Sequence, residues 1–132
     1  MNSITRRGAF GGAVTASIGT LMAVALAYGI DAVFGISRAQ RNGIASLLIA
    51  VAMLLGGFRA GLLEPSAPLT NGAAAAAIAA LPLHVIRIVQ RTQRHQPVPL
   101  VWMVFVTLLV ASLGVFGALV ANGANRQRGA AQ

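Results

Sequence analysis

Four long apolar segments, separated by short polar connections, dominate the pattern of the chain. A helix rises about 1.5 Å per residue, so about 20 apolar residues cross the roughly 30 Å hydrocarbon core of a bilayer. Each apolar run is long enough to do so, and we therefore expect four membrane-spanning helices. They cover residues 9–36, 44–63, 72–89 and 100–121.

The connections between these runs contain the residues that stop helices. They read SRAQRN, EPSAPLTN and QRTQRHQPVP. Pro82 is the one proline inside a run, and it should kink the third helix. Short connections place sequential helices side by side in opposite directions. The pattern therefore predicts an all-α, transmembrane four-helix up-down bundle, with residues 1–132 forming a single domain.

The composition favours a membrane protein over a soluble domain. The chain is 57% hydrophobic and only 9% charged. All ten basic residues are arginines, and Asp31 and Glu64 are the only acids, which gives a net charge of +8. No aromatic residues interleave with the arginines to stack on bases, so we expect a lipid bilayer with anionic headgroups as the partner and no nucleic acid. The lack of cysteine excludes thiol catalysis and thiolate metal sites.

The beginning of the chain allows a second interpretation. Residues 5–27 combine a basic start, an apolar core and the sequence Ala25-Leu26-Ala27, which resembles a signal peptide with its cleavage site. However, the apolar run continues to Ile36 and is long enough to span the membrane. This length favours an uncleaved first helix.

The distribution of arginines does not decide the orientation. If both termini are cytoplasmic, the inner side carries Arg6, Arg7, Arg59, Arg126 and Arg128, and the outer side carries Arg38, Arg41, Arg87, Arg91 and Arg94. The positive-inside rule depends on a difference that is absent here. The short N-terminal tail favours cytoplasmic termini, whereas the arginine-free EPSAPLT loop would suit the outer face. An equal distribution also permits insertion in both directions, which would produce an antiparallel dimer.

Three ionisable residues lie inside the apolar runs at similar depth. Asp31 precedes the end of the first run, and His84 and Arg87 precede the end of the third run on the same side of the membrane. A carboxylate is unfavourable near a helix C-terminus, so Asp31 should be protonated or paired with Arg87 or His84. The three residues would form either an interhelical ion pair or a proton or ion relay. The lack of a continuing chain of polar residues favours the ion pair.

Arg59 lies in the last turns of the second run, close in sequence to Glu64. We expect Arg59 to extend toward the membrane surface and to anchor the hairpin together with Glu64. An anion or headgroup site is the alternative, because the first amides of the third helix, near Asn71 and Gly72, would point at the same loop.

Small residues form strips that allow helices to approach closely. The second run contains Gly57-x-x-x-Gly61, and residues 73–77 of the third run offer facing alanines. The pattern leaves open whether this packing occurs within the chain or between chains. The predicted packing residues are Gly56, Gly57, Ala60, Gly61, Gly114 and Ala118.

Arginines also mark one membrane surface, together with Tyr28 and Trp102 as an aromatic belt. This basic rim could bind acidic lipid or an acidic partner domain, or it could serve as a set of ordinary anchors. His84 and His95 lack an acidic or cysteine partner at ligand spacing, so we expect neither a metal site nor a cofactor. The rim comprises Arg38, Arg41, Arg91 and Arg94.

The hairpin GGFRAGLLEPSAPLTNGAAAA resembles a pattern found in small uncharacterised four-span bacterial membrane proteins, in which a Gly-Gly-x-x-Ala-Gly helix end precedes a Pro-Leu-x-x-Gly helix start. The resemblance implies a location in the bacterial inner membrane and no known activity. The matching residues are Gly56, Gly57, Ala60, Gly61, Pro68, Leu69 and Gly72.

Three classes of function remain. The glycine strips and short loops favour a packing or assembly subunit, or an accessory component, of a larger bacterial membrane complex, with other membrane chains or further copies of itself as partners. The arginine balance and the Asp31, His84 and Arg87 group permit a small homo-oligomeric, possibly dual-topology, channel or exporter. A membrane enzyme would need a nucleophile with a base or a pair of carboxylates, which the sequence does not offer. We therefore expect no enzymatic activity.

Overall fold

Four long helices make up the structure, and each is long and apolar enough to cross a membrane. The computed structural model describes the backbone of residues 4–130 and the side chains of residues 4–127. The predicted all-α bundle of four candidate transmembrane helices is confirmed. The helices are α1 (Arg6–Phe34), α2 (Arg38–Leu63), α3 (Pro68–Gln93) and α4 (Leu100–Ala130).

Three helices begin earlier than the apolar runs do, and the difference is largest for α2 and α3. The start of α2 is set by a capping box, in which the Ser37 hydroxyl accepts from the Gln40 amide at 3.3 Å and the Gln40 side chain accepts from the Ser37 amide at 2.9 Å. The start of α3 is set by Pro68 in its first turn, where a missing amide donor costs nothing. Both helices therefore include polar residues that hydropathy alone assigns to loops.

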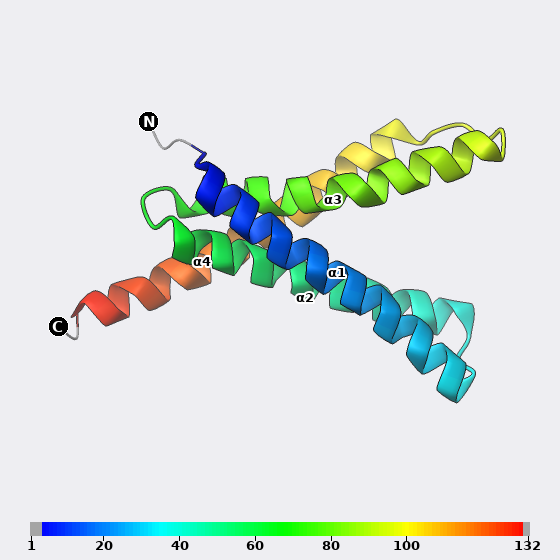
Figure 1. The fold of residues 1–132 in the computed structure, drawn as a ribbon, viewed down its shortest axis with the longest axis horizontal. Helices are drawn as coiled ribbons and strands as arrows, with labels where there is room; N and C mark the ends of the chain where they lie inside the picture. The colour runs from blue at the N-terminus through cyan, green and yellow to red at the C-terminus, as the bar shows by residue number, and fades with distance from the viewer. Residues whose placement is uncertain (1–3, 131–132) are drawn as a thin grey trace.

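The bundle is closed at one end and open at the other (Figure 1). The start of α1 and the connection between α2 and α3 lie at the closed end, and the last turns of α4 extend beyond it. The α1–α2 and α3–α4 hairpins diverge toward the other end. We call residues 24–48 the first arm and residues 84–107 the second arm. Among the described residues, α1 and α4 are the one pair of helices that does not pack together.

Small side chains fill the closed end, while large apolar side chains point outward. Most buried hydrophobic residues are alanines, and the largest fully buried side chains are Met53 and Asn71. Leu21, Val33 and Val101 are more than two-thirds exposed, as residues in contact with lipid can be. Because lipid is as apolar as these side chains, close van der Waals packing must hold the helices together.

Glycines bring the helix backbones into direct contact at the closed end. A Cβ atom on Gly57 would overlap the carbonyl oxygen of Gly114 and would lie 2.6 Å from its Cα. A Cβ atom on Gly12 would lie 2.6 Å from the carbonyl oxygen of Gly56. Carbon atoms in ordinary contact stand about 3.5–4.0 Å apart, so no larger residue fits. We call this region the glycine node; it comprises Gly12, Gly56, Gly57, Gly72, Gly114 and Gly117.

The glycine strips pack within the chain, but not with the predicted partner. Gly57 and Gly61 of α2 face Gly114 and Ala118 of α4, rather than the alanines at residues 73–77 of α3. Gly56 on the adjacent side of α2 faces α1. The reason is that α2 lies between α1 and α4, so its small residues serve two neighbours at once. Ala60, the remaining predicted packing residue, is fully buried beside the same contacts.

Candidate functional site

Asp31 of α1 forms an ion pair with Arg41, which lies in the first turn of α2. The Oδ2 atom of Asp31 accepts from Nη1 of Arg41 at 2.6 Å, and both side chains are about one-quarter exposed. The Arg41 guanidinium also lies over the ring of Tyr28, 4.7 Å from its centroid. The prediction that Asp31 pairs with Arg87 or His84 is therefore wrong.

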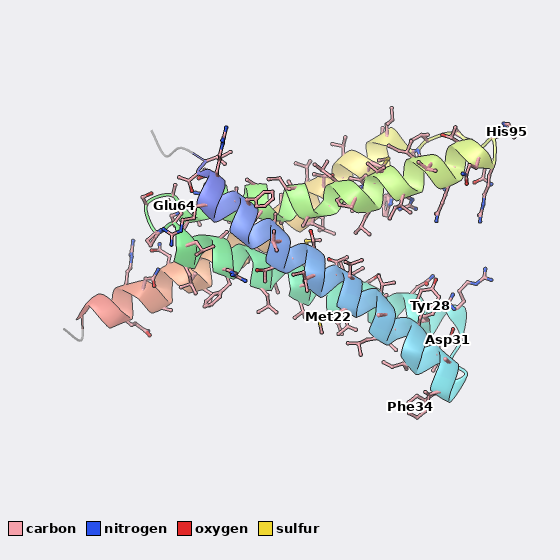
Figure 2. All side chains as sticks on the ribbon, viewed as in Figure 1. Met22, Tyr28, Asp31, Phe34, Glu64 and His95 are labelled. Atoms are coloured by element: carbon pink, nitrogen blue, oxygen red, sulfur yellow. The ribbon has the colours of Figure 1, made fainter. Side chains whose placement is uncertain are left out.

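The divergence of the arms explains this correction. Figure 2 shows Tyr28 and Asp31 near the tip of the first arm, whereas His95 lies at the tip of the second arm across the gap. Similar depth in the membrane does not bring two residues together when their helices separate. Arg41 lies three residues into α2 and is nearer to Asp31 than the residues of the second arm are. Because the connection between α1 and α2 is short, the sequence could have identified Arg41 as a candidate partner.

A hydrogen bond of His84 joins the two helices of the second arm. Its Nε2 atom lies 2.7 Å from the Thr107 hydroxyl, which itself donates to the Met103 carbonyl at 2.9 Å. The hydroxyl proton is thereby used, so Thr107 accepts and His84 Nε2 is the donor. Asp31 and His84 thus belong to separate arms, and the predicted relay has no continuous path between them.

Arg59 contacts α1 rather than Glu64. Its Nη1 atom donates to the Thr15 hydroxyl at 2.9 Å, and Thr15 in turn donates to the Gly11 carbonyl at 3.1 Å. This direction agrees with helix geometry, because the Cα–Cβ bond points toward the N-terminus of α2 and away from Glu64. The predicted anchor of Arg59 with Glu64 is wrong, and Arg59 instead links α2 to α1.

Glu64 lies at the closed end, beside the beginning of α1 (Figure 2). Its carboxylate accepts a hydrogen bond of 2.5 Å from the Ser66 hydroxyl. This bond, followed by contributions from Thr5 and the charge of Arg7, lowers the pKa of Glu64.

Asn71 is a buried structural link between α3 and α1. Its Oδ1 atom accepts from the Thr5 amide at 2.8 Å, and its Nδ2 atom donates to the Ala67 carbonyl at 2.8 Å. The backbone amide of Asn71 also donates to Ala67. Because α3 begins four residues earlier than expected, this amide is not available to an anion, and Gly72 packs against Gly114. The predicted anion site therefore loses its donors.

The basic rim is divided between the two arms. Arg38 and Arg41 lie near the tip of the first arm, and Arg91 and Arg94 lie near the tip of the second. Arg41 is held by Asp31, and Arg91 donates to the Pro97 carbonyl at 3.2 Å. The rim is therefore two separate basic groups on one side of the bundle.

A cleft of about 340 Å³ opens between α2, α3 and α4 where the arms begin to diverge. Its walls are mostly apolar, with Met53 and Leu83 among the lining residues. Ser46, His84 and Arg87 are the polar side chains that line it. The sequence does not predict this cleft, because it depends on how far the two hairpins separate.

A smaller pocket of about 120 Å³ lies between α1 and α3 at the same level. Thr20, Leu21, Pro82 and Ile86 line it. Thr20 is only 4% exposed, and its hydroxyl has no hydrogen-bond partner in the described part of the chain. A hydroxyl without a partner is unfavourable at membrane depth. The predicted kink residue Pro82 lies at this pocket, and α3 continues beyond it to Gln93.

The two carboxylates do not meet. Asp31 is bound to Arg41 near the start of α2, and Glu64 follows the end of α2. Within residues 4–127, no three His, Cys, Asp or Glu side chains lie close enough to hold a metal ion. Asp31, Arg59 and His84 instead each make a contact that joins two helices.

Comparison of the chain with protein-family models, curated proteins and solved structures gives no match. The resemblance of the α2–α3 hairpin to small four-span bacterial membrane proteins stays a prediction. The location in the bacterial inner membrane, which that resemblance implies, stays a prediction as well.

Proposed function

We propose that this multi-pass membrane protein is a non-enzymatic assembly subunit of a larger complex, in which a transmembrane helix of another chain lies between the two arms. The observation that carries this proposal is that the two arms diverge (Figure 1) and leave most of their side chains exposed. No described residue of α3 beyond Ala80 is buried, so the chain does not close the gap between the arms itself. A helix with its side chains is about 10–12 Å wide and is a suitable filler.

The pocket between α1 and α3 offers a place for a side chain of the partner helix. It lies at the base of the gap, where a helix between the arms would end its contact with the bundle. Thr20 belongs to its lining, but the hydroxyl of Thr20 is enclosed and the exposed lining is apolar. We therefore expect the partner helix to carry an apolar side chain at this depth, since close packing holds membrane helices together.

The contacts of the polar side chains support the absence of enzymatic activity. Asp31, Glu64, His84 and Arg59 each join elements of the fold, which is a structural use of the few polar groups in the chain. We further propose that the protein lies in the bacterial inner membrane with both termini in the cytoplasm, which places the arms toward the outer face.

Native particles cut from the membrane with an amphipathic copolymer test this function, because no detergent removes the partner. The wild-type chain should occur in particles that contain a second membrane protein at fixed stoichiometry, measured by mass photometry and quantitative mass spectrometry. Leu21→Trp places a large ring in the pocket between α1 and α3 and should release the partner.

Met22→Trp is the matched control, because Met22 is the next residue, is 59% exposed and does not line that pocket (Figure 2). It should leave the complex intact. Particles that contain only one copy of the chain would contradict the assembly function. Particles that contain several copies and nothing else would favour the homo-oligomeric channel or exporter instead.

A further inference from the structure

We infer that the cleft between α2, α3 and α4 binds one anionic phospholipid, with its phosphate against Arg87 and an acyl chain along the apolar wall. This site lies on the α2–α4 side of the bundle, whereas the proposed partner helix contacts the α1–α3 pocket. The cleft is also part of the gap between the arms, so the lipid would lie beside the partner helix. Lipid binding is measured on the purified chain, so failure of this inference and failure of the proposed function are distinguishable.

The charge of Arg87 is available to a ligand. In the described part of the chain, the one ion pair joins Arg41 to Asp31 on the other arm. Glu64 lies beyond the far end of α2, beside the start of α1. Arg91 follows Arg87 by one helical turn and adds a second positive charge toward the membrane surface. Basic pockets between transmembrane helices are sites for anionic headgroups.

The depth of Arg87 suits a phosphate. Helix α3 has 26 residues, so it extends about 39 Å and exceeds a hydrocarbon core of about 30 Å. Arg87 lies six residues before Gln93, or about 9 Å from that end of the helix. Ser46 lies eight residues after Arg38, the first residue of α2, or about 12 Å from the same membrane surface. These two polar side chains therefore face the cleft at similar depth.

The remainder of the cleft suits an acyl chain. Its volume of about 340 Å³ falls within the range of pockets that hold small ligands. Met53, Leu83 and Val110 lie on three different helices and provide an apolar lining. His84 lies closer to the membrane centre than Arg87. Its Nε2 atom is already hydrogen-bonded to Thr107, so an acyl chain beside it would not leave this donor without a partner.

Native mass spectrometry of the purified full chain tests the site. Phosphatidylglycerol and phosphatidylcholine with identical acyl chains are titrated into detergent micelles, and the bound fraction of each is measured. We expect one phosphatidylglycerol per chain, with about fivefold preference over phosphatidylcholine, the factor for about 1 kcal/mol from one arginine near a lipid surface. Arg87→Gln should remove this preference.

Arg38→Gln is the matched control, because it removes an exposed arginine from the other arm and should keep the preference. Ala50→Trp fills the cleft without a change of charge and should weaken the binding of both lipids. Unchanged preference in Arg87→Gln, or equal loss in Arg38→Gln, would overturn the site in favour of a general attraction to the rim. Unchanged binding in Ala50→Trp would exclude the cleft as the place of the acyl chain. Circular dichroism confirms that each variant is folded.

Discussion

The glycine node yields a prediction whose sign is opposite to ordinary helix propensity. In an isolated helix, Gly→Ala stabilises by about 1 kcal/mol. At Gly57 the added methyl group would meet the oxygen, carbonyl carbon and Cα of Gly114. These are backbone atoms, so α4 itself must move, and Gly114 is also in close contact with Gly72 of α3. The methyl group at Gly57 therefore strains two interfaces.

The magnitude follows from these contacts. Overpacking in a core costs about 1–3 kcal/mol, and rigid backbone on both sides places Gly57 at the upper end. After subtraction of the propensity gain, Gly57→Ala should destabilise the protein by about 2 kcal/mol. Gly43 lies in the same helix, and a methyl group added there would have no neighbouring atom within 4 Å. Gly43→Ala should therefore stabilise by up to about 1 kcal/mol.

Sodium dodecyl sulfate titration of the protein in mild detergent micelles, followed by circular dichroism, measures both variants against the wild type. The two substitutions should differ by about 3 kcal/mol in the free energy of unfolding. Equal stability of Gly57→Ala and Gly43→Ala would mean that α2 and α4 are not in backbone contact, and the packing described for the closed end would then be refuted.

Three further substitutions test individual contacts by the same titration. Asn71→Ala should cost about 1–3 kcal/mol, because it removes a fully buried side chain and the amide of Thr5 loses its acceptor. Thr70→Ala changes an exposed neighbour and should alter stability by less than about 0.5 kcal/mol. Equal effects of the two substitutions would contradict the link between α3 and α1. Thr107→Val should destabilise the protein by about 0.6 kcal/mol, and by at most about 1.7 kcal/mol, because the hydrogen bond to His84 is lost. Ser112→Ala is the control, because it removes a hydroxyl of the same helix that bonds only to the Leu108 carbonyl. Equal stability of the two variants would show that the bond to His84 does not hold the second arm together. The pKa of Glu64 in the folded protein lies below its ordinary value of 4.5, so the ionised carboxylate stabilises the fold fully above that pH. This stabilisation is lost as the pH falls through the lowered pKa, and Glu64→Gln should therefore flatten the decrease in stability between about pH 6 and about pH 3. An unchanged decrease would contradict this role of Glu64.

Much of the fold could be predicted from the sequence because the bilayer requires long apolar helices. The predicted helix starts lie too late where polar residues continue a helix outside the apolar run. Ser37 with Gln40, and Pro68, carry the correct boundaries as capping signals. Hydropathy alone does not detect these capping signals, because it measures the transfer of side chains from water to lipid and not the hydrogen bonds at helix ends.

The candidate site is harder to predict, because the lateral positions of helices cannot be read from depth. Asp31 lies at the same membrane depth as His84 and Arg87 of α3, but its partner is Arg41, which follows the connection between α1 and α2. Hydropathy places Asn71 in a loop, but it is buried between α3 and α1. The cleft and the smaller pocket both depend on the angle between two hairpins, which arises from the glycine contacts of all four helices.

The distance between the arm tips in the membrane tests the assembly function most directly. The chain contains no cysteine, so Phe34→Cys and His95→Cys place two spin labels at the tips of opposite arms (Figure 2). Pulsed electron paramagnetic resonance on native particles should find one narrow distance distribution, well beyond the roughly 8–10 Å between packed helices, because a partner helix keeps the arms apart. A distribution centred near the spacing of packed helices would show that the arms close on each other, and would leave no place for the partner.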